Sequence, residues 1–572
     1  MAGLGSSLFI GQSGLLASQA ALQAVGNNLA NLATPGYHKQ DVTLATNRST
    51  EIRRGLYVGT GVHVGSVTRR IDLALEDRLR GSVGDQAASS ARNDILKQIE
   101  SLENEFTDID ISSRFNNFLN VWSEIADKPT DNSIRTVLVS QGETLTSFIR
   151  NLREDLGKLR LQVDRTIDQS AAAADDLLTR IEDINRQISS AERGSGGAHG
   201  LRDQRDNLLG ELSQFMDISI HEQNNGAVDV FVGSLPVILN GLSRGVELEK
   251  KVVNNELKIQ MVIKDDRSAL DIRSGSIGAM VASRDQDVTG AIDQIDAFSK
   301  NLIFELNKLH AQGIGEVGFA TVTGTNRTTD STRALNDSLS GLKFTPNHGS
   351  FTIAVRQKST GQVNQTQIAI DLDGIGADTT LDSLIASINA VNDISASKTP
   401  DGMLQISANG NDFEILFGPD SSGTLAALGL NTFFTGEQAS DIAVNTVITN
   451  DVKKIAAGKI PTDGTFAWGT NDNALAIDLL RDKSLDVLGG LSLTQSWNKH
   501  VEDFSTRQSQ SKNKLDADTI VRENLENQRQ GVSGVNSDEE AVNLLSYQRA
   551  YQGSARFLQV INELMDTLIN LV

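Results

Sequence analysis

Apolar residues recur at helical spacing at both ends of the chain. Near the N-terminus, one position repeats every seven residues, at Leu8, Leu15, Leu22 and Leu29, and a second is filled by Gly11, Ser18, Val25 and Leu32. At the C-terminus, a stripe steps by three and four to the last residue: Leu544, Tyr547, Tyr551, Ser554, Leu558, Ile561, Met565, Leu568 and Val572. Such a pattern, sustained over about four heptads, predicts a coiled coil. Each stripe is the simplest partner for the other, so we expect the two ends of the chain to pack together.

This terminal pair is expected to be weak by itself. Ordering about 65 residues costs about 1–2 kcal/mol each in backbone entropy. Burying about fifteen apolar side chains returns only about 1.5–3 kcal/mol each. We therefore expect the ends to be mobile in a monomer and ordered where neighbouring copies cover them. The alternative is an ordinary coiled coil within one chain.

Long internal helices are predicted where proline is absent, between Pro129 and Pro236 and after Pro461. One apolar face continues for about 40 residues or more at 3.6-residue spacing: Leu152, Leu156, Leu159, Val163, Ile167, Ala174, Leu177, Ile181, Ile184, Ile188 and Ala191. Similar one-sided stripes precede it at 95–106 and 115–125, and a weaker one follows at 497–525. Because each stripe needs a partner, a helical bundle is expected.

The middle of the chain alternates between apolar and polar residues, which indicates strands. The stretch "VDVFVGSLPVILNGLSRGVELE" contains Asn240-Gly241, a strong hairpin signal. The predicted fold class is multidomain and mainly α with inserted β domains (α+β): a terminal coiled coil, a long-helix bundle and outer β-rich domains. The expected division is a coiled-coil domain (1–40 with 535–572), a mainly helical bundle (41–216, 265–316 and 475–534), a small β region (217–264) and β-rich inserted domains (317–474).

Composition narrows the possible functions. At 572 residues, the chain is expected to hold three or four domains, and it contains no apolar run of 18 residues. A net charge of −21 disfavours nucleic acid as the main partner. No cysteine is present, which excludes disulfides and thiolate chemistry. The first basic residue is Lys39, so a secretory signal is not expected. The chain is therefore expected in the cytoplasm, or outside the cell by a route that cleaves no signal.

Candidate catalytic motifs are weak. Gly241-Leu-Ser-Arg-Gly245 matches G-x-S-x-G, but a nucleophile elbow needs a following helix and here an alternating strand follows. His221-Glu222 lacks the second histidine of a zinc protease motif. We predict no catalytic residue, cofactor or metal site.

The two end segments carry a resemblance to a known family. "LGSSLFIGQSGLLASQAALQAVGNNLANLATPGYHKQ" resembles the N-terminal signature of the bacterial flagellar axial proteins, which are the rod, hook and hook-associated proteins. "SGVNSDEEAVNLLSYQRAYQGSARFLQVINELMDTLI" resembles their C-terminal signature. The form Ala33-Thr34-Pro35-Gly36-Tyr37 followed by "HKQ", taken with "SGVNSDEEA", is most similar to the members that join hook to filament. "NLIFELNKLHAQG" and "LGLNTFFTG" are also similar to those members.

The resemblance implies a structural protein of the flagellum and no enzyme. It implies type III export without a cleaved signal, a cytoplasmic export chaperone that holds the C-terminal helix, and an extracellular location at the hook–filament junction. The implied partners are the hook protein, the second junction protein and further copies in a ring, without nucleic acid or membrane insertion. The alternatives are another axial member, such as hook or rod protein, and a secreted hydrolase.

The conformation of the N-terminal family motif can also be explained physically. The motif residues are Asn28, Asn31, Thr34, Pro35, Gly36 and Tyr37. Thr34 precedes a proline and is disfavoured in the α conformation, so the first helix is expected to end there. Pro35-Gly36 then turns the chain outward, and Tyr37 anchors the turn. Asn27, Asn28 and Asn31 either face solvent or hydrogen-bond across a subunit contact and set its register.

Overall fold

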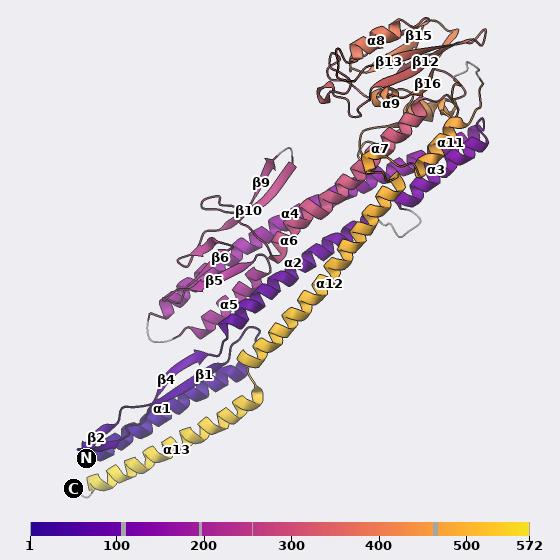
Figure 1. The fold of residues 1–572 in the computed structure, drawn as a ribbon. Coiled ribbons are helices and arrows are strands. Elements are labelled where there is room, and N and C mark those ends of the chain that lie inside the picture. The colour runs from indigo at the N-terminus through magenta and orange to yellow at the C-terminus, as the bar shows by residue number, and fades with distance from the viewer. Residues whose placement is uncertain (1, 104–109, 194–196, 254–255, 462–466, 571–572) are drawn as a thin grey trace. The chain divides into compact units, whose positions relative to one another are not determined.

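The computed structural model describes residues 2–103, 110–193, 197–253, 256–461 and 467–570. The chain forms two compact units, the first from 1–95, 163–284 and 510–572 and the second from 96–162 and 285–509. Three helices contribute residues to both units (Figure 1): α2 (Leu73–Glu103), α4 (Asn132–Ala191) and α12 (Leu493–Ser533). This grouping differs from the domains expected above, which stay a prediction.

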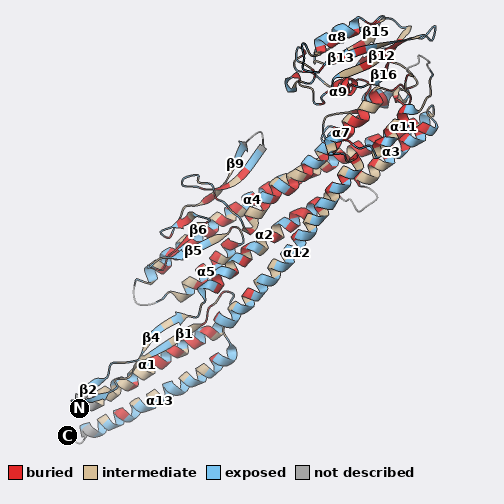
Figure 2. Cartoon of the chain, viewed as in Figure 1, coloured by how far each residue is buried: buried red, intermediate tan, exposed pale blue. Residues whose placement is uncertain are grey.

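The first unit contains both chain ends. Helix α1 (Ala2–Ala30) and helix α13 (Ser537–Asn570) run antiparallel along each other (Figure 1). Their contacts pair low numbers on α1 with high numbers on α13, from Gly11 with Leu558 to Asn28 with Glu540. Exposed residues dominate α13 (Figure 2). Most of the surface of α13 is therefore uncovered within the described chain.

Four short strands follow α1. They are β1 (Gln40–Thr46), β2 (Thr50–Arg53), β3 (Leu56–Val58) and β4 (Val62–Arg69). Strands β1 and β4 pair antiparallel from Gln40↔Arg69 to Thr46↔Val62, and β2 pairs with β3. Val62 N–H donates to Ser13 Oγ at 3.2 Å, which holds the β1/β4 ribbon against α1. We call residues 40–69 the arm; these strands lie in a stretch that the sequence assigned to a mainly helical domain.

The rest of the first unit packs small sheets on α4. Its elements are α5 (His199–Ser213), β5 (Ile218–Glu222), β6 (Val228–Val232), β7 (Leu235–Leu239), β8 (Leu242–Ser243), β9 (Val246–Val253), β10 (Glu256–Ile263) and α6 (Gly275–Ser283). Strands β5-β6-β7-β8 form one antiparallel sheet, and β9 pairs with β10. Asn185 on α4 exchanges two hydrogen bonds with the backbone of Val228. Asn240 and Gly241 both have positive φ between the paired strands β7 and β8, which confirms the predicted hairpin.

The second unit has an aromatic core between helices. Its helices are α3 (Ile111–Asp127), α7 (Thr289–Ala311), α9 (Thr424–Leu428), α10 (Thr446–Asn450) and α11 (Asp472–Asp478), and a π-helical turn (Arg284–Val288) precedes α7. Phe118, Trp122 and Phe433 stack edge to face or tilted, with ring centroids 5.5–6.5 Å apart. The predicted stripe at 115–125 is the buried face of α3.

A β-rich region completes the second unit. Its elements are β11 (Thr321–Thr323), β12 (Gly349–Gln357), β13 (Val363–Ile370), α8 (Leu381–Asn389), β14 (Ile394–Lys398), β15 (Leu404–Ala408), β16 (Phe413–Asp420), β17 (Phe434–Thr435) and β18 (Ala443–Val444). The sheet orders are β13-β12-β16, β11-β15-β14 and β17-β18, all antiparallel. Phe351, Ile353, Leu384 and Phe417 share one buried core. The mainly α architecture with inserted β regions is confirmed.

Candidate assembly site: the terminal helix pair and its anchor

Helices α1 and α13 approach closely because the residues between them are small. A Cβ added at Gly11 would lie 2.7 Å from Leu558 Cδ2, and one added at Gly14 would lie 2.8 Å from Ser554 Oγ. Ala17, Ser18, Ala21, Ala24 and Val25 are buried on α1. At these two points, glycines of α1 meet Leu558 and Ser554 of α13, and no leucine of α1 stands between the helices.

The predicted coiled-coil residues fall into three groups. Val25 and Ile561 are buried. Half-buried positions are Leu8, Leu15, Leu22, Leu29, Leu544, Tyr547, Leu558 and Met565. Leu32 and Tyr551 are exposed. The side chain of Leu568 lies outside the described residues.

Helix α1 ends at Ala30, four residues before the expected end at Thr34. Asn31 N–H is shared between the carbonyls of Asn27 and Asn28, and its side-chain amide donates to Asn27 O. Because the Asn31 side chain itself donates to the Asn27 carbonyl, this hydrogen bond does not require the helix to continue. The helix therefore ends at this point. Leu32 therefore lies beyond the end of α1, with 48% of its surface exposed, and its assignment to a subunit or coiled-coil interface stays a prediction.

The Thr34-Pro35-Gly36-Tyr37 segment is a tight turn. Tyr37 N–H donates to Thr34 O at 3.3 Å, and Gly36 has φ +74°, which is the type II pattern of proline followed by glycine. Asn207 on α5 donates to Pro35 O, and its Oδ1 lies 1.7 Å from the position that a Cβ on Gly36 would take. Glycine is required here both by the backbone angle and by the approach of α5.

Asn28 lies at the centre of a buried polar junction. Its Nδ2 donates to Glu540 Oε2 on α13 and to Gln40 O, both at 3.0 Å. Its Oδ1 accepts from Gln40 N–H at 3.0 Å and from Tyr37 Oη at 2.8 Å. Asn28 is 1% exposed, so the solvent-facing alternative is wrong for this residue. Burial, and then the nearby Asp203 and Glu540, raise the pKa of Tyr37 to about 12, which keeps its hydroxyl protonated as a donor.

Lys39 ties the same segment to the C-terminal helices. Its Nζ lies 2.9 Å from Glu540 Oε1 and 3.0 Å from Glu539 Oε2, and its N–H donates to Ser533 O at 2.9 Å. Burial raises the pKa of Glu540, but hydrogen bonds from Asn28 and Lys39 outweigh it and hold the pKa below its usual value. Glu540 is therefore a buried carboxylate with a compensating cation and amide.

His38 ties the segment to the helical part of the unit. It is 2% exposed, with Nδ1 2.8 Å from Asp203 on α5 and Nε2 3.3 Å from Glu76 in the first turn of α2. Burial alone would lower the pKa of His38, but hydrogen bonds to Asp203 and Glu76 raise it to about 9. His38 is thus an imidazolium at neutral pH and donates on both sides. We call residues 37–40 the anchor segment.

Arg69 completes the ionic cluster. Its guanidinium contacts Asp203 at 2.8 Å and Asp206 at 2.7 Å. His38, Asp203 and Asp206 lie close enough together to hold a metal ion. Arg69 already supplies the positive charge that these carboxylates need, so the geometry favours an ion-pair cluster.

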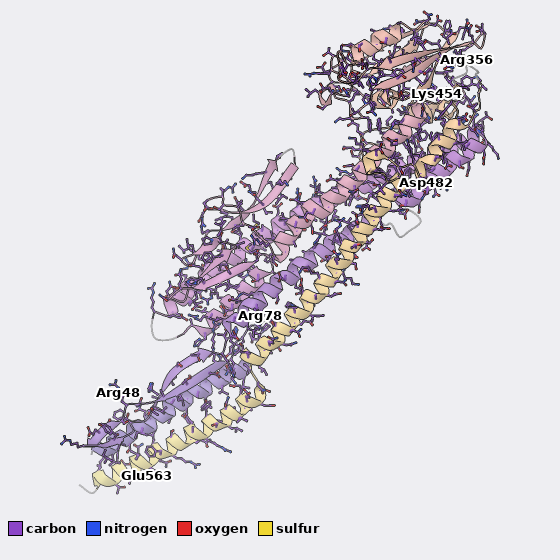
Figure 3. All side chains as sticks on the ribbon, viewed as in Figure 1. Arg48, Arg78, Arg356, Lys454, Asp482 and Glu563 are labelled. Carbon is purple, nitrogen blue, oxygen red and sulfur yellow. The ribbon has the colours of Figure 1, made fainter. Side chains whose placement is uncertain are left out.

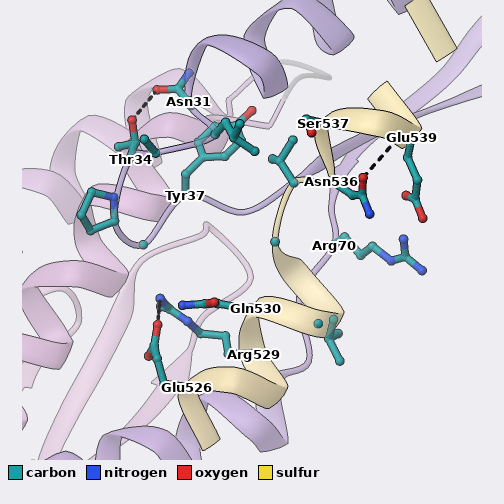
Figure 4. Close-up of a pocket in the computed structure, with 18 residues that line it drawn as sticks. Asn31, Thr34, Tyr37, Arg70, Glu526, Arg529, Gln530, Asn536, Ser537 and Glu539 are labelled. Atoms are coloured by element: carbon teal, nitrogen blue, oxygen red, sulfur yellow. Dashed lines mark hydrogen bonds and ion pairs between the residues drawn. The ribbon is translucent and has the colours of Figure 1, made fainter. Parts of the chain in front are cut away.

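A hollow of about 870 Å³ opens beside the anchor segment. It is lined by the turn at 31–37, by Arg70 and by the connection from α12 to α13 (Figure 4). Arg529 pairs with Glu526 at 2.7 Å on its wall. The junction of the terminal helices is therefore open to solvent on one side.

Sequence reasoning identified the turn and Asn28 but missed the residues that hold them. These are His38, Lys39, Arg69, Glu76, Asp203 and Glu540. One signal was present: the basic "HKQ" after the turn and the acidic "SDEEA" at the start of the last helix have opposite charges.

Comparisons with known proteins converge on one family. Residues 96–326 match a family model described as "Flagellar hook-associated protein FlgK helical domain". Flagellar hook-associated protein 1 of Escherichia coli K12 is 26% identical over 575 residues, covering 98% of both chains. This chain is similar to flagellar hook-associated protein 1 along almost its whole length. Flagellar hook-associated protein 1 of Bacillus subtilis 168 is 23% identical over 571 residues, covering 97% of this chain and 96% of that protein.

The ends of the chain match broader flagellar families. Residues 8–38 match "Flagella basal body rod protein" and residues 527–571 match "Flagellar basal body rod FlgEFG protein C-terminal". A solved structure of the flagellar hook junction protein FlgK from Burkholderia pseudomallei shares the fold, with TM-score 0.53 and 15% identity over 80% of this chain and all of that one. None of the described helices has the length and hydropathy needed to cross a membrane.

Proposed function

We propose that this chain is a structural component of the bacterial flagellum and forms the junction between hook and filament. The observation that carries the proposal is the collinear similarity to flagellar hook-associated protein 1 over 98% of both chains. A similarity limited to the ends would suit any axial protein. The internal match at 96–326 is what favours the junction member over hook or rod protein.

Assembly with neighbouring axial proteins fits the unused surfaces of the terminal helices. Phe9 and Leu16 are exposed on α1, and Val542, Leu545 and Val560 are exposed on α13. Exposed apolar stripes of this kind mark contacts with other chains. The implied neighbours are hook protein, the second junction protein and further copies of this chain in a ring.

The proposed location is outside the cell, at the hook–filament junction. The chain travels through the flagellar type III apparatus without a cleaved signal, and a cytoplasmic chaperone holds α13 before export. The chaperone role suits α13 because most of that helix remains exposed after pairing with α1 (Figure 2).

No catalytic role is proposed. Ser243 of the G-x-S-x-G match lies in β8, and strand β9 follows at Val246 in place of the helix that a nucleophile elbow requires. Ser243 N–H donates to Glu182, and its Oγ accepts from Gly245 N–H. Replacing Ser243 or exposed His221 by alanine is expected to leave swimming normal. A loss of swimming in Ser243→Ala cells that fold and export the protein would favour the hydrolase alternative.

The decisive experiment removes the gene and examines the cells by electron microscopy. Hooks without filaments, together with filament protein in the medium, are expected. Loss of the hooks themselves would identify the chain as a hook or rod protein instead. Immunogold labelling of purified flagella is expected to mark the boundary between hook and filament.

A further inference from the structure

The tip of the arm exposes apolar residues that nothing in the described chain covers. Leu56, Tyr57 and Val58 form β3 and are all exposed, Tyr57 by 64%. Successive side chains of a strand point to opposite faces, so β3 is uncovered on both of its faces within the described part of the chain. A two-stranded hairpin is only marginally stable alone in water. This tip therefore needs a surface to cover it.

Helix α13 carries a second apolar stripe beside the face that packs on α1. Leu558 and the edge of the Phe557 ring lie against Gly11 of α1, but Phe557 keeps 41% of its surface exposed, and Val560 is exposed by 51% and Leu564 by 49%. Spacings of three and four place Phe557, Val560 and Leu564 on one face, which we call the outer strip. The pairing of α1 with α13 thus leaves an apolar strip on the C-terminal half of α13.

The charges of the two surfaces are opposite. Residues 40–70 contain five arginines and two acidic residues in a chain of net charge −21. Arg48 and Arg54 are exposed near the tip. Helix α13 contains five acidic residues and two arginines, and exposed Glu563 and Asp566 flank the apolar strip. Arg48 and Glu563 project from the arm and from α13 respectively (Figure 3).

The two surfaces lie on different sides of α1. The arm packs on α1 through Ser13, and α13 packs through Gly11 and Gly14. Figure 1 shows the arm along one side of α1 and α13 along the other. When two complementary surfaces face different directions, copies can join head to tail, with the first surface of one copy bound to the second surface of the next. Such association generates a ring or a helix of copies.

We propose that the arm tip (Leu56, Tyr57 and Val58) of one copy docks on the outer strip of α13 (Phe557, Val560 and Leu564) of a second copy. Arg48 and Arg54 then face Glu563 and Asp566 of the neighbour. The contact repeats from copy to copy around the structure. This inference rests on the proposed function, since it describes how copies of this chain meet in the junction.

Because the chain has no cysteine, engineered pairs report this contact directly. Cells express Tyr57→Cys and Val560→Cys as separate copies, and purified flagella are oxidised mildly. A disulfide-linked dimer containing one of each variant is expected. A chain that carries both changes is expected to give a ladder of multiples, because each copy then links to two neighbours. The matched control pairs Val560→Cys with Ser66→Cys, an exposed arm position away from the tip, and is expected to give no adduct.

The outcomes separate this inference from the proposed function. Flagella that contain both variants but no mixed dimer would overturn the docking. Tyr57→Cys adducts with itself, or with hook or filament protein, would also overturn it. Leu56→Cys with Leu564→Cys repeats the measurement if the first pair fails to reach the flagellum. Absence of the unaltered protein from purified flagella would instead overturn the proposed function.

Discussion

Asn28 on α1 donates a 3.0 Å hydrogen bond to Glu540 at the start of α13, joining residues 512 positions apart in the chain. The same side chain is hydrogen-bonded to both backbone groups of Gln40 and to the hydroxyl of Tyr37. Asn28 therefore sets the register of the two terminal helices and fixes the anchor segment between them.

Replacing Asn28 by leucine is expected to loosen the terminal pair. Leucine has a similar volume but leaves Glu540 and the Gln40 backbone without partners in a buried place, which costs about 1–3 kcal/mol. Hydrogen exchange is expected to show lower protection along α13. Asn27→Ala is the control, because Asn27 is exposed one residue away and is expected to cost less than about 0.5 kcal/mol. Equal protection in the two variants would show that Asn28 does not hold the helices.

The anchor segment is expected to loosen at alkaline pH. His38 has a folded pKa of about 9, above its ordinary value of 6.5. The folded state therefore binds more protons between these values, so the stabilisation is complete below about pH 6.5 and is lost as the pH rises through about 9. Protection factors of residues 37–40 are expected to fall over this range. In His38→Gln, the same amides are expected to be less protected at pH 6 and to change little with pH.

The titration of His310 in the second unit is expected to give the opposite pH dependence, with stability lost as the pH falls. Full burial lowers its pKa to about 4, helped by nearby Arg135. Its Nε2 accepts from Ala456 N–H and its Nδ1 faces Asn431 O, so it is held neutral. The unfolded chain binds the extra proton between pH 6.5 and 4, and stability is lost as the pH falls through that range, by at most about 3 kcal/mol. Trp122, whose ring centroid is 6.1 Å from His310, is the fluorescence probe.

His310→Gln is the control for this pH dependence. Glutamine removes the titrating group, so the variant is expected to be less stable at pH 7 and to lose little further stability down to pH 4. A variant that retained the full acid sensitivity of the unaltered chain would assign it to other groups.

Gly36→Ala is expected to disrupt the turn. Alanine at φ +74° costs about 1–2 kcal/mol, and its Cβ would overlap Asn207 Oδ1. Cells that carry it are expected to swim poorly although the protein is exported. Adding Asn207→Ala removes the overlap but not the backbone strain, so partial recovery is expected. A Cβ added at Gly59 would meet no atom within 4 Å, so cells that carry Gly59→Ala are expected to swim normally.

Local patterns predicted the elements whose signal lies within one segment. The periodic stripe predicted α4, which extends from Asn132 to Ala191, and Asn240-Gly241 predicted its hairpin. His38 was missed because its partner Asp203 lies 165 positions away and no local pattern links them. The arm was missed because its strands are short and interrupted by glycines. The end of α1 was misplaced because Asn31 stops the helix with its own side chain before Pro35 can.

The C-terminal stripe predicts one specific phenotype. Leu558 lies over Gly11 in the contact between α1 and α13. Aspartate at this position loses about 2 kcal/mol of apolar burial, and in the assembled junction it also places a carboxylate without a partner in a buried contact, which costs several kcal/mol more. The second compact unit does not include residue 558 and is expected to melt unchanged.

Leu558→Asp cells are therefore expected to make and export soluble protein, yet to bear hooks without filaments and to release filament subunits into the medium. Gln559→Asp is the matched control, since Gln559 is exposed on the neighbouring face of the same helix. Cells that carry Gln559→Asp are expected to swim normally. Normal swimming of Leu558→Asp cells would show that the face of α13 toward α1 carries no essential contact. The apolar periodicity of the last helix would then need another explanation.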